Sequence, residues 1–134
     1  MCSSGQEENL EHVLYYCPNS RRVWRSIQTL LVEFKGTDIR INRINATTGF
    51  WRTEVNDELL IVNTICSITR FHLWKIRCKV KYGNEVFDYL KSTRLLKSSL
   101  RNHIENVLSS TSSNNQVLQM MRNLDKLIQE MIFL

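Results

Sequence analysis

The sequence predicts an all-α domain of about five helices, a helical bundle around a long central helix at residues 56–82. Three observations predict this class. The 134 residues fit one domain of ordinary size, and 43% of them are hydrophobic, which is enough for a core. Four glycines and one proline leave few helix breakers. Apolar residues recur at helical spacing along most of the chain.

The first helix is predicted at residues 7–17, where apolar residues have helical spacing and Glu7 and Glu8 suit the positive end of the helix dipole. Pro18 is predicted to end it, and Asn19 or Ser20 to cap a second helix that runs to about residue 34. Residues 35–54 are predicted to form an extended connection. Isoleucines alternate with polar residues there as in a strand, but no partner strand is recognisable.

The central helix has a plausible cap in Asn56, followed by Asp57 and Glu58, and Gly83 suits its end. Its first half is apolar almost all round, which indicates a central position, and its second half is basic. A fourth helix is expected from Asn84 to about residue 108. Its predicted buried face consists of Val86, Phe87, Leu90, Leu96, Leu100, Ile104 and Val107.

Residues 109–115 form a Ser/Asn-rich segment that is predicted to be a flexible linker, followed by a terminal helix at 116–134. Apolar residues of this helix are spaced by four and three, as in a short heptad seam. This seam predicts an interaction face, and a homodimer through it is one expectation; alternatively the helix closes the core of a monomer. The seam consists of Val117, Met121, Leu124, Ile128 and Met131.

The chain has four cysteines, and no signal peptide or membrane span is recognisable. We therefore expect a nuclear or cytoplasmic protein rather than a secreted one, with no membrane partner. In a reducing compartment, cysteines are typical metal ligands or buried thiols rather than disulfides. The ordered set Cys2, His12 and Cys17, with nine and four residues between them, supplies zinc-ligand types, but structural zinc sites normally have four ligands.

The first 24 residues resemble the zinc-binding, CCHC-like segment in the C-terminal domain of non-LTR (LINE-type) retrotransposon reverse transcriptases. In that family a cysteine pair and a Gly/Glu-rich stretch precede H-x4-C, a basic pair and a tryptophan. Residues 63–77 also resemble the helix that follows this segment. The matching residues are Cys2, Gly5, Glu7, Glu8, Leu10, Glu11, His12, Leu14, Cys17, Pro18, Arg21, Arg22 and Trp24.

The resemblance implies a non-catalytic domain that helps a reverse transcriptase hold its RNA template or target DNA in the nucleus. Its partners would be RNA or DNA and the rest of the polyprotein, which carries the polymerase and the endonuclease. The family's first cysteine would precede Cys2, where this chain has only Met1. Either the chain is a fragment cut inside the zinc knuckle, or the metal site has decayed, or Cys66, His72 or Cys78 completes it. Zinc is thus conceivable, but the incomplete ligand set favours a metal-free chain.

Basic residues are concentrated between Arg70 and Arg101, where nine basic and two acidic residues give a net charge of +7, more than the +5 of the whole chain. Their helical spacing predicts basic faces on two neighbouring helices, which either contact phosphates or merely solvate the outside of the bundle. The candidate nucleic-acid-binding residues are Arg21, Arg22, Arg25, Arg70, Lys75, Arg77, Lys81, Lys91, Arg94, Lys97 and Arg101.

Three neighbouring side chains, Phe71, His72 and Trp74, could stack on unpaired bases. The usual burial of large aromatics instead favours core positions for Trp24 and Trp74, whereas Trp51, in the irregular connection, is expected to be exposed. No catalytic constellation is recognisable, so we do not expect an enzyme. The alternative to nucleic-acid binding is a protein-interaction module derived from such a domain, with the terminal helix as its docking face.

Overall fold

A computed structural model describes residues 9–51, 56–110 and 115–133. Within these residues the regular structure is helical throughout, so the prediction of an all-α bundle is confirmed. The elements are the π-helix η1 (His12–Tyr16) and the α-helices α1 (Pro18–Lys35), α2 (Arg43–Thr48), α3 (Asp57–Tyr82), α4 (Tyr89–Ser110) and α5 (Asn115–Glu130).

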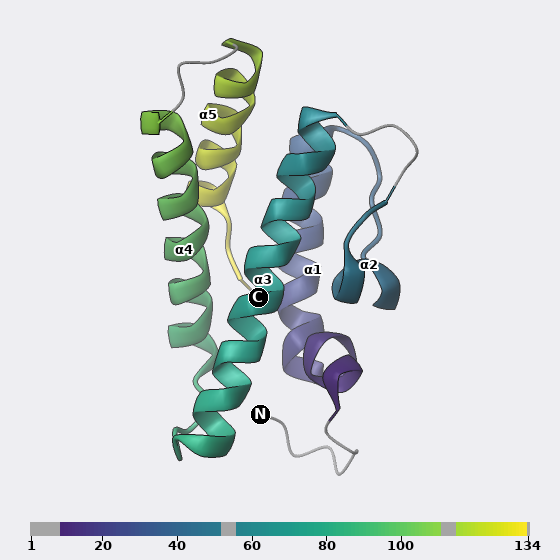
Figure 1. Ribbon diagram of the computed structural model, residues 1–134, viewed down its shortest axis with the longest axis vertical. Helices are drawn as coiled ribbons and strands as arrows, with labels where there is room; N and C mark the ends of the chain where they lie inside the picture. The colour runs from purple at the N-terminus through teal and green to yellow at the C-terminus, as the bar shows by residue number, and fades with distance from the viewer. Residues whose placement is uncertain (1–8, 52–55, 111–114, 134) are drawn as a thin grey trace.

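Helix α3 runs through the middle of the bundle, with α4 and α5 on one side and α1 and α2 on the other (Figure 1). Helices α4 and α5 form an antiparallel pair, and α5 also packs against α1. One continuous core joins all of them, and its fully buried side chains include Ile27, Leu31, Val62, Leu73, Leu96, Leu100, Leu124 and Ile128. Among the described helices, none combines the length and the apolar character needed to cross a membrane.

Helix α3 begins and ends as the sequence predicts. The Asn56 side chain accepts a hydrogen bond of 2.8 Å from the Leu59 N–H. Asp57 and Glu58 occupy the first turn, where their negative charges interact favourably with the positive end of the helix dipole. The Gly83 N–H donates to the carbonyl of Lys79 and closes the last turn.

The start of α4 was predicted too early. Asn84 adopts a left-handed conformation with φ of 53°, so it cannot begin a right-handed helix. The helix starts at Tyr89, after Asp88, whose carboxylate accepts a hydrogen bond from the Lys91 N–H. Val86 therefore lies outside the helix and is 92% exposed, and Leu90 is exposed as well. The later positions of the predicted face are buried as expected, namely Leu96, Leu100 and Ile104.

The boundary between the first two helices also differs from the prediction. Pro18 begins α1 instead of separating it from the preceding helix. Proline suits the first helical position because its missing N–H would have no intrahelical partner there. Gly36 ends α1 with φ of 71°, a left-handed conformation that glycine adopts without strain.

Helix α2 lies where an extended connection was predicted. Its first turn is stabilised by a capping box, in which the side chains of Asn42 and Asn45 each accept a hydrogen bond from the other's backbone N–H. Ile39 and Ile41 are buried, as their alternation suggested, but they pack without forming a strand.

The predicted linker and interaction face are corrected at the C-terminus. Residues 109 and 110 belong to α4 and residue 115 to α5, while residues 111–114 lie outside the described part. In the seam, Met121, Leu124 and Ile128 are buried and Val117 and Met131 are half-buried against the core. Because α5 packs on α4 and α1, the seam closes the chain's own core rather than forming a free docking face.

Candidate nucleic-acid interface

In the described part of the segment that carries the family resemblance, residues 9–24, η1 packs against the start of α1. The Cys17 N–H donates to the His12 carbonyl at 2.7 Å, the i→i+5 bond of a π-helix. Two side chains of α1 bind carbonyls of η1: the Ser20 hydroxyl donates to Val13, and the Trp24 indole N–H donates to Leu14. Trp24 is buried, as predicted, and it holds η1 against α1.

The three predicted zinc ligands are only partly described. Cys2 lies outside the described residues, and both His12 and Cys17 are buried at the two ends of η1. Within residues 9–51, 56–110 and 115–133, no group of three or more His, Cys, Asp or Glu side chains is placed to hold a metal ion. Cys66 is buried on α3, and burial raises the pKa of its thiol to about 11.

Two of the predicted phosphate-binding residues are instead used to hold α5 against α4. The Lys97 ammonium donates to the carbonyls of Gln129 and Met131 at 2.9 and 3.0 Å, where it caps the end of α5. Arg101 forms an ion pair with Asp125 of α5 at 3.3 Å. Their common face was predicted correctly, but that face meets α5 rather than solvent.

Two predicted residues of α3 also turn inward. Arg77 is 8% exposed, and its guanidinium lies over the rings of Trp74 and Tyr82. Arg70 is half-buried and points toward the carbonyls at the end of α2 at 3.5 Å. The predicted basic surface shared by α3 and α4 is therefore not continuous.

The remaining predicted basic residues are exposed. Arg22 stacks its guanidinium 3.7 Å above the Tyr89 ring, which joins the start of α1 to the start of α4. The exposed candidates are Arg21, Arg22, Arg25, Lys75, Lys81, Lys91 and Arg94.

Arg21 and Arg25, which were predicted, lie on α1, and Arg40, which the sequence did not suggest, lies on the connection to α2. Arg21, Arg25 and Gln28 follow one stripe of α1, because they are spaced by four and three residues. The Gln28 side-chain carbonyl accepts a 2.8 Å hydrogen bond from the Ile41 N–H, which binds to α1 the segment that carries the exposed Arg40. We call Arg21, Arg25 and Arg40 the arginine patch.

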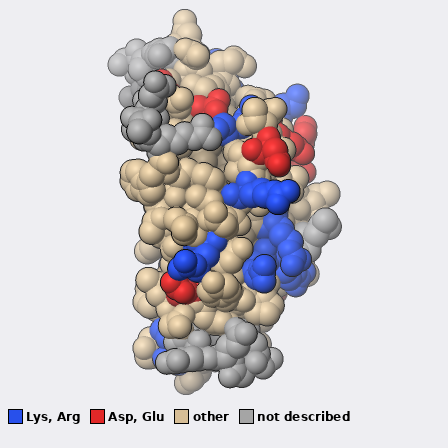
Figure 2. All heavy atoms as spheres, turned by 90° about the vertical axis from the view of Figure 1, so that its right-hand side faces the viewer, with Lys and Arg blue, Asp and Glu red and all other residues tan. Residues whose placement is uncertain are grey.

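The arginine patch faces solvent, since all three of its residues are exposed. Figure 2 shows Lys and Arg side chains gathered on the α2 side of the bundle, with the acidic residues of that view mostly above or below them. Among the described residues, no ion pair joins the arginine patch to an acidic group. Arg43, at the start of α2, is bound to Glu11 at 2.9 Å.

The second half of α3 exposes three aromatic rings, and one of them, Trp74, was expected in the core. Phe71 is 66% exposed, Trp74 41% and Tyr82 72%, so the core prediction for Trp74 is wrong. Together with Lys75 and Lys81 these residues form the aromatic stripe. Its five positions lie within about 120° of one another around the helix at 3.6 residues per turn. Trp51, as predicted, is exposed.

His72 does not belong to this stripe. It is buried against α4, where its Nε2 lies 3.2 Å from the Ser92 hydroxyl. Burial lowers the pKa of His72, and the nearby Lys75 and Lys79 charges lower it further, against the opposing effect of the Ser92 hydrogen bond. A neutral, buried imidazole is not available to stack on a base.

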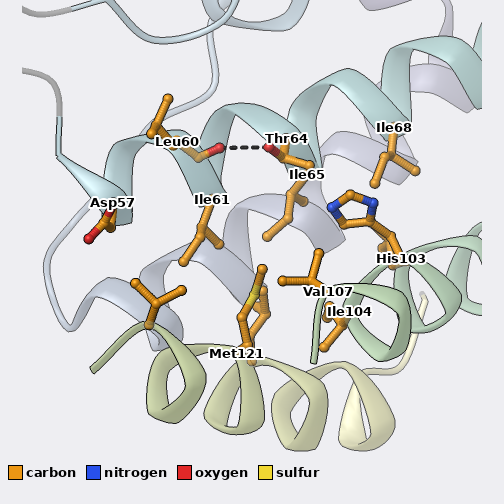
Figure 3. Close-up of a pocket in the computed structure, with 13 residues that line it drawn as sticks. Asp57, Leu60, Ile61, Thr64, Ile65, Ile68, His103, Ile104, Val107 and Met121 are labelled. Carbon is orange, nitrogen blue, oxygen red and sulfur yellow. Dashed lines mark hydrogen bonds between the residues drawn. The ribbon is translucent and has the colours of Figure 1, made fainter. Parts of the chain in front are cut away.

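An apolar cavity of about 250 Å³ lies between the first half of α3, the end of α4 and the start of α5 (Figure 3). Aliphatic side chains such as Ile61, Ile65, Ile104 and Met121 line most of it. Its titratable lining residues are Asp57 and His103, and no nucleophile–base pair is described there.

Comparisons with protein-family models, with curated proteins and with solved structures find no match for this chain.

Proposed function

We propose that this chain is a non-catalytic nucleic-acid-binding domain that holds RNA or DNA mainly through phosphate contacts. The observation that carries the proposal is the arginine patch: Arg21 and Arg25 are exposed on α1, and the hydrogen bond between Gln28 and Ile41 joins α1 to the segment that carries the exposed Arg40. Guanidinium groups donate several hydrogen bonds in a planar array that suits phosphate oxygens. The net charge of +5 supports the same class of partner.

We further propose, from the resemblance of residues 2–24, that the domain belongs to a non-LTR retrotransposon reverse transcriptase. It would hold the RNA template or target DNA for a polymerase encoded elsewhere in the same polyprotein. This origin is a separate claim from nucleic-acid binding, and the arginine patch supports only the latter. The proposal does not include a zinc ion.

The direct test measures binding of a fluorescein-labelled single-stranded RNA by anisotropy between ~50 and ~200 mM salt, where phosphate contacts weaken steeply. The test variant is Arg21→Ala/Arg25→Ala. The matched control is Arg122→Ala/Lys126→Ala, which removes the same charge from exposed positions of α5, away from α2.

Loss of two phosphate contacts is expected to reduce the slope of log affinity against log salt by about 1.4 for a single strand. The control variant is expected to keep nearly the whole slope. Absence of binding at ~50 mM salt, or equal losses in both variants, would contradict the proposal.

A further inference from the structure

We propose that the aromatic stripe of α3 binds unpaired bases, so that the domain prefers single-stranded nucleic acid over a duplex. This inference rests on the proposed function and names the form of nucleic acid that the domain recognises. It depends on the outer face of the second half of α3, whereas the proposed function depends on the arginine patch.

The rings of the stripe are outside the core for a geometric reason. Leu73 and His72 take the inward positions of the same turn and are buried, so their neighbours Phe71 and Trp74 must point outward. Tyr82 continues this face two turns later. From Phe71 to Tyr82 the stripe extends about 16 Å along the helix at 1.5 Å per residue.

Cations accompany every ring. The Lys75 ammonium lies 5.9 Å from the Phe71 ring centre and the Lys81 ammonium 5.6 Å from that of Tyr82. The Arg77 guanidinium also lies 5.3 Å from the Trp74 ring centre, but it is buried, so the exposed cations of the stripe are Lys75 and Lys81. No acidic residue occurs from residue 59 to residue 84.

This combination fits a single strand because aromatic faces stack on exposed bases while neighbouring cations meet the phosphates between them. The bases of a duplex are already stacked on each other, so the rings gain nothing from them. An aromatic surface can also dock a protein, but a run of cations without an acidic residue favours a polyanion.

The test compares three probes of equal length: a single-stranded RNA, the corresponding RNA duplex and an abasic single strand that keeps the phosphates. The variant Trp74→Ala/Tyr82→Ala removes two rings and no charge. A second aromatic variant, Tyr16→Ala, removes an exposed ring outside the stripe and serves as control. Circular dichroism confirms that each variant is folded.

Wild-type protein is expected to bind the single strand at least about tenfold more tightly than the abasic strand, because each stacked base contributes about 1–3 kcal/mol. Trp74→Ala/Tyr82→Ala is expected to abolish this difference and to leave duplex binding nearly unchanged. Tyr16→Ala is expected to keep the difference.

Equal binding of the single strand and the abasic strand by wild-type protein would overturn the inference but leave the proposed function standing. If Trp74→Ala/Tyr82→Ala binds the single strand as tightly as wild-type protein does, the inference is likewise overturned and the proposed function stands. The stripe would then be a candidate site for a protein partner. No binding of any probe at ~50 mM salt would overturn both proposals.

Discussion

The two halves of α3 bury the same side of the helix, but their outward positions carry different kinds of residue. In the first half, the outward positions carry Leu60, Thr64 and Ser67, and the flank toward α4 and α5 is covered by aliphatic side chains. In the second half, the outward positions carry Phe71, Trp74 and Tyr82 with lysines between them. The inward face is closed in both halves, by Val62 and Leu73 for example.

This difference indicates that the location of an aromatic residue depends on its angular position more than on its size. The side chains that α4 brings to the second half, such as Ser92, meet His72 and leave the outer face uncovered. Large exposed rings favour aggregation, so a group of them on a protein surface usually marks a site that binds a partner. The aromatic stripe is therefore the feature of this helix that function best explains.

The largest expected contrast is between two consecutive residues of the second half. Leu73→Ala creates a cavity in the core and is expected to lower the free energy of unfolding by about 2–5 kcal/mol. Trp74→Ala, at an outward position, is expected to lower it by less than about 1 kcal/mol. Urea denaturation followed by circular dichroism measures both, and similar losses would show that Trp74 is packed rather than exposed.

The next contrast uses a cysteine in each half. Cys66 is buried in the first half with a thiol pKa of about 11, whereas Cys78 is partly exposed in the second half. The raised pKa alone reduces the thiolate population of Cys66 about 100-fold relative to a thiol with a pKa of 9.0. Alkylation by iodoacetamide at pH 8, followed by mass spectrometry, should therefore modify Cys78 well before Cys66. Comparable rates would indicate that the first half opens readily.

Substitution of two lysines is expected to affect stability in one case and RNA binding in the other. Lys97→Met removes the cap of α5 and is expected to cost about 1.5–3 kcal/mol of stability, the range for hydrogen bonds to a charged group, without weakening RNA binding. Lys75→Met, in the aromatic stripe, is expected to weaken RNA binding several-fold with little change in stability. Thermal denaturation measures the change in stability, and fluorescence anisotropy measures the change in RNA affinity. If Lys97→Met weakened RNA binding and Lys75→Met did not, the binding surface would lie on α4.

The smallest expected effect is the pH dependence contributed by His72. Its pKa in the folded protein lies below the ordinary 6.5, so the unfolded chain binds the proton more readily. Stability is therefore expected to fall as the pH is lowered through about 6.5 toward the folded pKa. His72→Gln should flatten this part of the profile in urea titrations at pH 7.5, 6.5 and 5.5. An unchanged profile would show that another group is responsible.

The sequence predicts α3 well because its signals are local. Asn56 and the acidic first turn mark its beginning, and Gly83 marks its end. The short helix α2 was missed because it is stabilised by a reciprocal Asn42–Asn45 cap rather than by an apolar period. The start of α4 was misplaced because the left-handed conformation of Asn84 depends on the tight connection after α3.

The environment of the candidate binding residues was harder to predict because it is set by distant segments. Spacing placed Lys97 and Arg101 on one face, but only the position of α5 decides that this face is covered. The segment of Arg40 is bound to α1 through a hydrogen bond between residues 28 and 41, which no periodicity reveals. The exposure of Trp74 could have been found, since residues 62, 65, 69 and 73 define a buried face that excludes it.

The most direct measurement is photo-crosslinking of the protein to a single-stranded RNA that contains 4-thiouridine, with the linked peptides identified by mass spectrometry. Binding through the aromatic stripe predicts crosslinks at Phe71, Trp74 or Tyr82, and their loss in Trp74→Ala/Tyr82→Ala. Crosslinks confined to other helices, with none between residues 71 and 82, would contradict it.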